Sequence, residues 1–234
     1  MADFFFYGTL CHAPLLDCVL GRKVDHVPAR LAGHAVHWAE GQLFPMILRR
    51  DGAVANGILV RGLSDLDVAR LDFYEGGFDY GTSEVVLDGG AVARVYFPEP
   101  GVWVAGAPWV LADWVARFGA VVVATAGDFM AAMGQRPARE VLARYPQMLV
   151  RGASRVRAAA GAPAGVRRTA HPTDVAVVAR SEPYARFFSV EEYDLRYRRF
   201  DGTMSDTINR AAFISGDAAT VLPYDPQRDV VMLV

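Results

Sequence analysis

The feature that most constrains the fold is an aromatic run near the N-terminus, Phe4-Phe5-Phe6-Tyr7, which ends at Gly8. Residues 3–8 are nearly all apolar, and a short apolar run that stops at a glycine is typical of a strand buried on both faces. The chain can supply the core that such a strand needs, because 53% of its 234 residues are hydrophobic. This length favours one large domain, or one domain with a smaller second unit.

The charge balance favours a small polar metabolite as the ligand. Lysine and arginine together number 24, and aspartate and glutamate 26, so the net charge indicates neither nucleic acid nor a membrane surface as a partner. The N-terminus lacks the pattern of a secretory signal, and no uninterrupted apolar run approaches the ~18–20 residues that span a bilayer. We therefore expect a cytoplasmic protein that binds no nucleic acid and no membrane.

Turn signals divide the N-terminal part of the chain into strands. Asp51-Gly52 is the strongest short hairpin signal, and it predicts a turn that leads into a returning strand over 54–62. Asp88-Gly89-Gly90 predicts another hairpin within the β segments of 82–97. A short helical turn is expected from Pro14.

A short helix separates these strands and ends at an acidic residue. Ser64 is a good N-cap, and the apolar spacing that follows it predicts a helix over 65–74, closed by Gly76-Gly77. Glu75 then lies at the negative end of the helix dipole, which disfavours an ionised carboxylate and raises its pKa toward the range of a general base near neutrality. A solvated glutamate at a helix end is the ordinary alternative.

The segment Tyr7-Gly8-Thr9-Leu10 also has two interpretations. A glycine permits backbone angles that point successive N–H groups into one concavity, where a carboxylate or phosphate binds without a charged side chain. The alternative is a buried strand followed by an ordinary tight turn.

The composition changes in the second half of the chain. Segments 108–118 and 137–160 have helical spacing, and each begins with a proline placed as a helix starter. The Gly/Ala/Pro segment 161–165 and the arginines that follow it are typical of an exposed linker. From Val175 the chain is β-rich, with strands expected around 187–190, 208–214, 218–222 and 229–234. A β-rich segment of this length without a covering helix is marginal as an independent core, so we expect a second domain that is cut short.

Several segments of the N-terminal half occur in a characteristic order: Tyr7-Gly8-Thr9-Leu10, Phe44-Pro45, Asn56-Gly57-Ile58-Leu59, Leu71-Asp72-Phe73-Tyr74-Glu75-Gly76 and Tyr80. In order and spacing they resemble the γ-glutamylcyclotransferase-like (AIG2-like) family over about residues 3–100. The resemblance implies a small mixed β-barrel in which backbone N–H groups of Gly8, Thr9 and Leu10 hold the α-carboxylate of a γ-glutamyl group. It implies Glu75 as the catalytic base, with Tyr7 and Tyr80 completing the substrate-binding site.

The activity that this resemblance implies is cyclisation of a γ-glutamyl amine or peptide to 5-oxoproline with release of the amine. The nucleophile and the electrophile belong to one molecule, so holding that molecule folded supplies much of the rate. The N-terminal domain therefore needs no metal and no cofactor, and its partner is a small molecule with a γ-glutamyl group.

A second resemblance lies at the other end of the chain, in these segments: 197–205, Gly216-Asp217-Ala218 and 221–226. They resemble the N-terminal portion of Nudix ADP-ribose pyrophosphatases, especially the tellurite-resistance-associated type with an AIG2-like domain in front. The carboxylate-rich Nudix box that holds Mg²⁺ is absent, so Mg²⁺ is expected only if a complete Nudix domain exists beyond Val234. The resemblance implies a homodimer through this segment. The alternative to the cyclotransferase function is that the N-terminal unit is a non-catalytic accessory or dimerisation module of a Nudix ADP-ribose pyrophosphatase.

The fold class predicted is α+β: a small mixed γ-glutamylcyclotransferase-like β-barrel, a helical connector and a partial β-rich Nudix-like segment. The predicted boundaries are 1–105 for the first domain, 106–172 for the connector and linker, and 173–234 for the fragment.

Other chemistry-bearing residues favour structural interpretations. His34 and His37 are three apart in an expected strand and point to opposite faces, so they do not form a metal pair. The basic run 151–168 lacks interleaved aromatics and is interpreted as the solvated face of a helix with its linker. Cys11 and Cys18 are too far apart for a relaxed disulfide if the segment is helical, so free thiols are expected, with Cys11 packed rather than nucleophilic.

Overall fold

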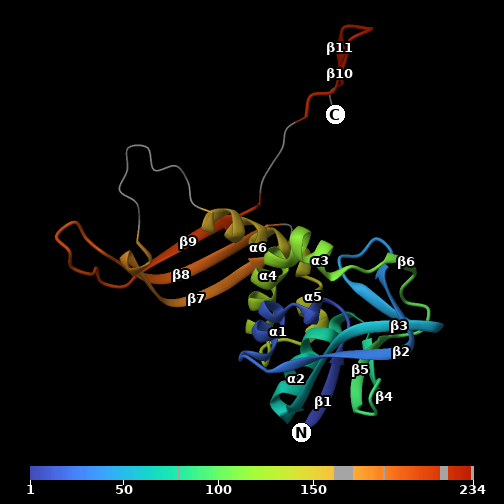
Figure 1. Ribbon diagram of the computed structural model, residues 1–234. Helices are drawn as coiled ribbons and strands as arrows, with labels where there is room; N and C mark the ends of the chain where they lie inside the picture. Colours follow the sequence, from blue (N-terminus) through green and yellow to red (C-terminus); the bar gives the residue numbers. More distant parts are fainter. Residues whose placement is uncertain (79, 161–170, 187, 217–220, 233–234) are drawn as a thin grey trace. The chain divides into compact units, whose positions relative to one another are not determined.

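The computed structural model divides into two compact units, residues 1–161 and 162–234, and each unit is described by itself (Figure 1). The described residues are 1–78, 80–160, 171–186, 188–216 and 221–232. The expected linker 161–165 lies outside them, as do parts of the strands expected at 187–190, 218–222 and 229–234. The domain boundaries after residues 105 and 172 stay predictions.

Unit 1 combines a six-stranded sheet with helices, so the α+β fold class is confirmed. Its strands are β1 (Ala2–Phe6), β2 (His26–Ala39), β3 (Pro45–Leu63), β4 (Tyr80–Val86), β5 (Val92–Pro98) and β6 (Ala105–Pro108). Its helices are η1 (Thr9–Cys11), α1 (Ala13–Leu20), α2 (Asp65–Glu75), η2 (Gly76–Phe78), α3 (Leu111–Trp114), η3 (Val115–Gly119), α4 (Ala120–Ala131), α5 (Ala138–Leu142) and α6 (Tyr145–Ala159).

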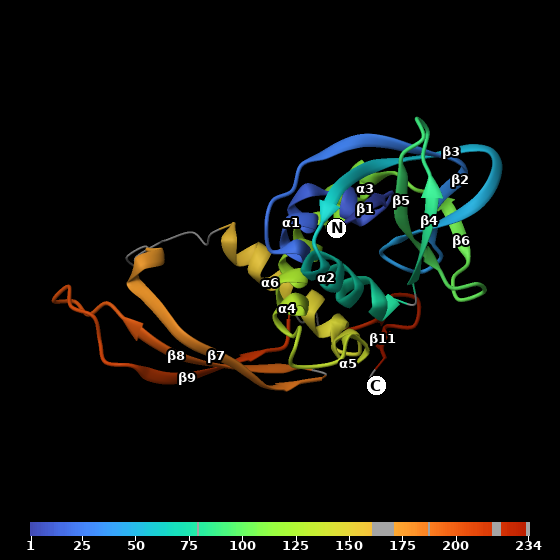
Figure 2. The same cartoon turned by 90° about the horizontal axis from the view of Figure 1, so that it is seen from below.

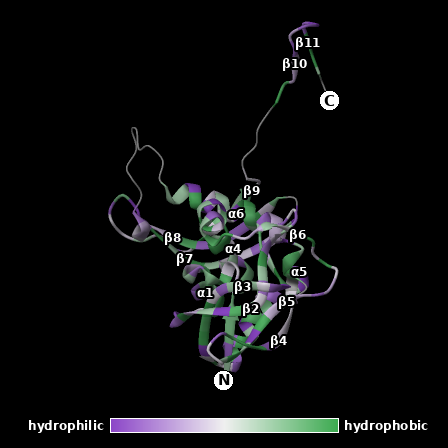
Figure 3. Cartoon of the chain, turned by 45° about the vertical axis from the view of Figure 1, so that its right-hand side comes forward, coloured by the Kyte–Doolittle hydropathy of each residue, from purple (hydrophilic) through white to green (hydrophobic). Residues whose placement is uncertain are grey.

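The sheet has the order β4-β5-β1-β3-β2-β6 and curls into a half-barrel (Figure 2). Strand β1 pairs antiparallel with β3 and parallel with β5, so it is a central strand. Hydrophobic and hydrophilic colours alternate along the strands (Figure 3), as expected where the two faces of a sheet have different environments.

The aromatic strand β1 is buried on both faces, as predicted. Phe4 and Phe6 belong to the core that the sheet shares with the helices. Phe5 and Tyr7 point the other way, into the core inside the curled sheet. Because successive side chains of a strand alternate between faces, this one strand joins the two cores of the unit.

The prediction of a hairpin turn at Asp51-Gly52 is wrong, because these residues lie inside a strand. Strand β3 continues through these residues and pairs with β2 along nearly its whole length, and the connecting turn lies at residues 40–44 instead. The pairing register shifts between Ala32 and His34, where β3 carries the additional residues of a bulge. Gly52 has a φ of 75°, so the turn-forming dipeptide bends a strand here rather than ending one.

The other local predictions for this part are confirmed. Helix α2 begins after Ser64, whose side chain forms a reciprocal capping box with Asp67, and it ends at Glu75. Strands β4 and β5 form a hairpin whose turn contains Gly89 and Gly90 at positive φ. Helix α1 contains Pro14 in its first turn, and both cysteines are free thiols.

The helix Leu111–Ala131, formed by α3, the π-helical turn η3 and α4, was predicted only over its first residues. By length and composition it is long and apolar enough to cross a membrane. Its side chains Trp114, Val122 and Phe129 are nevertheless buried in the core shared with the sheet.

The prediction that the basic run from Arg151 is a solvated face is wrong for Arg151 itself. This side chain is 2% exposed, and its guanidinium lies 3.0 Å from the carboxylate of Asp128 on α4. Arg155 reaches the same carboxylate at 2.9 Å. Helix α6 therefore docks on α4 through a buried ion pair, which compensates the charge that it removes from water.

Unit 2 is built on a three-stranded antiparallel sheet in the order β7-β8-β9. Its elements are η4 (Pro172–Asp174), β7 (Val175–Ala185), β8 (Ser189–Tyr197), β9 (Ile208–Ile214), β10 (Tyr224–Asp225) and β11 (Val230–Val231). The strand predicted at 208–214 is confirmed. Glu191 is buried in this sheet, where it binds the Arg180 guanidinium at 2.6 Å and accepts a hydrogen bond from the Tyr193 hydroxyl.

The close approach of β1 and β3 yields a stability prediction. A Cβ atom at Gly57 would lie 2.0 Å from the backbone oxygen of Phe6, so Gly57→Ala forces the two strands apart and is expected to lower the free energy of unfolding by roughly 1–3 kcal/mol. Gly127→Ala is the control, because nothing lies within 4 Å of a Cβ there and alanine favours the helix by up to about 1 kcal/mol. Urea denaturation measures both, and an unchanged midpoint for Gly57→Ala would contradict the packing argument.

Candidate functional site

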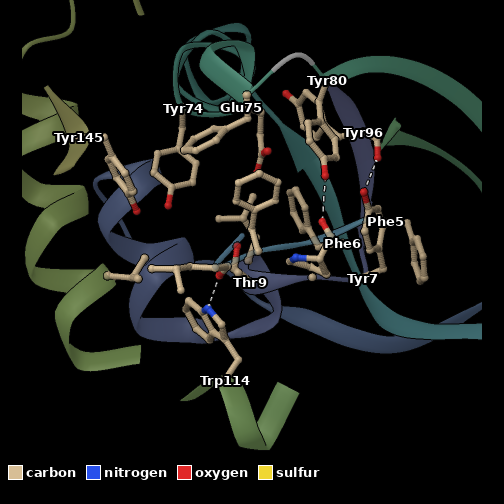
Figure 4. Close-up of a pocket in the computed structure, with 17 residues that line it drawn as sticks. Phe5, Phe6, Tyr7, Thr9, Tyr74, Glu75, Tyr80, Tyr96, Trp114 and Tyr145 are labelled. Carbon is tan, nitrogen blue, oxygen red and sulfur yellow. Dashed lines mark hydrogen bonds between the residues drawn. The ribbon is translucent and has the colours of Figure 1, made fainter. Parts of the chain in front are cut away.

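Glu75 and the turn after β1 line the same pocket of unit 1 (Figure 4). All the residues predicted for the site lie there: Tyr7, Gly8, Thr9, Leu10, Glu75 and Tyr80. The pocket is a cavity of about 70 Å³ that is partly open to solvent.

The turn after β1 is fixed by close packing against the start of β3. A Cβ atom at Gly8 would lie 2.6 Å from Cγ of Pro45, so only glycine allows the two segments to approach this closely. The first hydrogen bond of η1 joins the Cys11 N–H to the Gly8 carbonyl at 3.0 Å. The N–H groups of Thr9 and Leu10 therefore have no acceptor within the turn, and they remain available to an anion.

Glu75 is the last residue of α2 and extends into the cavity between Tyr74 and Tyr80 (Figure 4). Its side chain is partly buried, and burial raises the pKa of the carboxyl from its ordinary value of 4.5 to about 7. Desolvation is thus the cause of the increase that the helix dipole was expected to produce. Within the described part of the chain, no hydrogen bond or ion pair holds this carboxylate.

Tyrosine hydroxyls surround the carboxylate but bind mainly to the protein. The Tyr80 hydroxyl donates to the Pro45 carbonyl at 2.9 Å, and the Tyr7 hydroxyl donates to the Tyr96 carbonyl at 2.8 Å. Burial and the nearby Glu75 carboxylate raise the pKa of Tyr80. These phenols therefore stay protonated at neutral pH and do not compete with Glu75 as bases.

The structure adds pocket residues that the sequence did not indicate. Trp114, Val122 and Tyr145 come from the helices that follow the sheet and form one wall of the cavity. The Trp114 indole donates to the Leu43 carbonyl at 2.8 Å, and the Tyr74 and Tyr145 hydroxyls lie side by side (Figure 4). No local pattern marks these side chains as functional, because tertiary packing alone brings them to the site.

Cys11, His34 and His37, the other chemistry-bearing residues considered in the sequence, are bound to backbone carbonyls. The Cys11 thiol donates to the Phe6 carbonyl at 3.1 Å, and burial raises its pKa to about 12, which suits a packed thiol. His34 and His37 each bind a backbone carbonyl through Nδ1, of Ala32 and of Gly106. Among the described residues, no group of three or more His, Cys, Asp or Glu side chains is placed to hold a metal ion.

The fold and this pocket define a domain class. Residues 4–115 match the model of the family described as gamma-glutamyl cyclotransferase, AIG2-like. The resemblance inferred from the sequence motifs is thereby confirmed, and residues 4–115 form a domain of that family.

The chain is similar to two groups of curated proteins. Protein AIG2 C of Arabidopsis thaliana is 32% identical over 102 residues, which cover 43% of this chain and 60% of that protein. ADP-ribose pyrophosphatase of Escherichia coli (strain K12) is 46% identical over 61 residues, 26% of this chain and 29% of that enzyme. The chain thus spans less than a third of the length of the pyrophosphatases that it matches.

Solved structures are also similar to this chain. A solution structure of an Arabidopsis thaliana protein is 26% identical and has a TM-score of 0.40, covering 58% of this chain and 85% of that one. A structure titled gamma-glutamyl cyclotransferase is 13% identical with a TM-score of 0.40, covering 60% of this chain and 85% of that one.

The raised pKa of Glu75 predicts a pH dependence of stability. Between pH 4.5 and about 7 the folded state holds a proton that the unfolded state releases, so the free energy of unfolding falls as the pH rises through this window. We expect Glu75→Gln to remove this decrease, which amounts to roughly 1–3 kcal/mol.

Urea denaturation at pH 5 and pH 8 measures the difference for each variant. Glu84→Gln is the control, because Glu84 is exposed on β4, and this variant should keep the wild-type dependence. Equal pH dependence in the wild type and in Glu75→Gln would show that Glu75 titrates as an ordinary solvated carboxyl.

Proposed function

We propose that unit 1 cyclises a γ-glutamyl amine or peptide to 5-oxoproline and releases the amine. The observation that carries the proposal is that Glu75, whose pKa is raised to about 7, lines the same pocket as the Gly8–Leu10 turn. A base poised near neutrality and an anion-binding turn are the two parts that this reaction needs. The match of residues 4–115 to the cyclotransferase family supports the same assignment.

The turn positions the substrate in this proposal. The N–H groups of Thr9 and Leu10, left without acceptors inside η1, bind the α-carboxylate of the γ-glutamyl group. The pocket then holds the α-amine near Glu75, with the rings of Tyr7 and Tyr80 as walls. Because a folded γ-glutamyl group brings its own amine to its own carbonyl, positioning supplies much of the rate.

Glu75 moves the protons. Its carboxylate takes a proton from the α-ammonium group, and the resulting amine attacks the γ-carbonyl carbon to form the ring C–N bond. The bond from that carbon to the leaving nitrogen then breaks while the protonated Glu75 returns its proton to the leaving amine. The ring nitrogen loses its second proton to the regenerated Glu75 carboxylate, which passes it to the released amine, so that the amine departs as an ammonium ion and the lactam is neutral at nitrogen. A carboxyl with a pKa of about 7 can perform these transfers near neutral pH. The reaction so written needs no metal and no cofactor, and a cytoplasmic location suits a small-molecule substrate of this kind.

Glu75→Gln tests the proposed base. It is expected to lower kcat/KM for 5-oxoproline release by about 10²–10⁴-fold, since the amide cannot accept the proton. In the wild type kcat/KM is expected to rise with pH through about 7, where Glu75 ionises. Chromatographic detection of 5-oxoproline from a panel of γ-glutamyl amides and dipeptides measures both. The Glu84→Gln control should retain full activity, and a panel without any Glu75-dependent product would overturn the proposal.

We propose as a second candidate that unit 1 is an accessory module of a Nudix ADP-ribose pyrophosphatase, and that residues 173–234 mediate its homodimer. The similarity to the Escherichia coli enzyme over 61 residues supports it. The sheet of unit 2 also exposes apolar side chains that a complete domain or a partner would bury: Val175, Val177, Val178 and Phe213. The Nudix box is absent from the sequence, so this chain by itself is not expected to hydrolyse ADP-ribose.

A matched pair of valines tests the dimerisation part. Val177 on β7 is 55% exposed and Val92 on β5 is 54% exposed, so arginine is tolerated at both sites in a monomer. If unit 2 mediates a homodimer, Val177→Arg should shift the sedimentation coefficient to that of a monomer, whereas Val92→Arg should not. A wild-type chain that sediments as a monomer at high concentration would contradict the proposed dimer.

A further inference from the structure

The pocket offers one charged group to a ligand. Among the described residues that line it, Glu75 carries the only ionisable carboxylate, and neither lysine, arginine nor histidine is present. The rest of the wall is aromatic or aliphatic. Phe44 belongs to this wall, with its ring centroid 5.3 Å from that of Phe78 and 5.1 Å from that of Trp103.

Four polar side chains of this wall already donate hydrogen bonds within the protein. The hydroxyls of Tyr7 and Tyr80 donate to backbone carbonyls, and the Trp114 indole does the same. The Tyr96 hydroxyl donates to the Asp72 carboxylate at 2.6 Å. A ligand therefore meets ring faces and edges over most of the surface and finds few free donors.

A γ-glutamyl group uses the carboxylate of Glu75 and the N–H groups of the turn. In the proposed reaction its α-carboxylate takes the N–H groups of the Gly8–Leu10 turn, and its α-amine takes Glu75. A further carboxylate or ammonium on the leaving group would lie against apolar side chains with no partner of opposite charge. Taking an unpaired charge out of water is strongly unfavourable.

We propose that this pocket selects γ-glutamyl amides whose leaving amine is apolar and otherwise uncharged, an alkyl or aromatic amine, over γ-glutamyl amino acids and γ-glutamyl diamines. The inference rests on the proposed cyclotransferase function, which it makes specific. Two of the apolar and aromatic residues that line the pocket come from helices α4 and α6: Val122 and Tyr145. Both helices lie beyond residues 4–115, which match the family.

Three substrates whose leaving groups carry no additional charge, a negative charge or a positive charge test the proposal. They are γ-glutamylanilide, γ-glutamylalanine with an additional carboxylate, and γ-glutamylputrescine with an additional ammonium group. With the full chain, kcat/KM for the anilide is expected to exceed that for each of the others by at least about tenfold. 5-Oxoproline is common to the three reactions, so one chromatographic assay serves them all.

A charge placed in the wall should change this order. Leu43 lines the pocket and is 38% exposed, so Leu43→Lys adds a cation at the pocket without burying it in the core. It is expected to raise kcat/KM for γ-glutamylalanine relative to the anilide by about fivefold or more, because the ammonium pairs with the additional carboxylate. Leu66→Lys is the matched control, since Leu66 is 66% exposed on α2 and does not line the pocket.

The outcomes separate this inference from the function on which it rests. Release of 5-oxoproline from the alanine or putrescine substrate at a kcat/KM equal to or above that of the anilide would overturn the selectivity and leave the cyclotransferase function standing. Absence of 5-oxoproline from all three substrates and from the wider γ-glutamyl panel would overturn both. Thermal unfolding of the Leu43→Lys variant confirms that it is folded before its kinetics are compared.

Discussion

The close packing of β1 between two cores is the constraint on which the rest of unit 1 depends. Its aromatic side chains fill the helix-side core on one face and the inside of the curled sheet on the other. Gly57 lets β3 approach the backbone of Phe6, and Gly8 lets Pro45 close over the end of the strand. Because the strand cannot shift without opening both cores, the turn that follows it has a fixed position, and so do the N–H groups of Thr9 and Leu10.

The position of Glu75 is fixed in the same way, from the two ends of helix α2. At its start, the capping box of Ser64 and Asp67 is strengthened by Arg22, 2.7 Å from the Asp67 carboxylate. At its end, the buried ring of Tyr74 packs against Phe129, with centroids 5.6 Å apart. The helix therefore holds a carboxylate partly out of water without giving it a partner. The packing of the helix offsets that unfavourable burial, and the result is a base poised near neutral pH.

The sequence predicted the parts of this arrangement that local rules decide. The aromatic run, the Ser64 cap and the glycine turn at 88–90 each carry their own physical signal, and each forms the expected element. Asp51-Gly52 carries the strongest short hairpin signal, yet the long pairing of β2 with β3 outweighs it and leaves a bulge. Trp114, Val122 and Tyr145 could not be predicted for the pocket, because their positions depend on how the later helices dock on the sheet. The burial of Arg151 could not be predicted either, because only the fold brings its guanidinium to the carboxylate of Asp128.

Those later helices also affect the chemistry of the site. The residues that match the cyclotransferase family end at 115, whereas α4 and α6 supply further wall residues and pack on each other through the buried pair of Arg151 and Asp128. By covering the pocket they keep water from the Glu75 carboxylate, and desolvation is the cause of its raised pKa. If α4 and α6 were absent, water would reach the carboxylate and its pKa would fall toward its ordinary value. The proposed base thus depends on side chains that lie far along the chain from the motif that carries it.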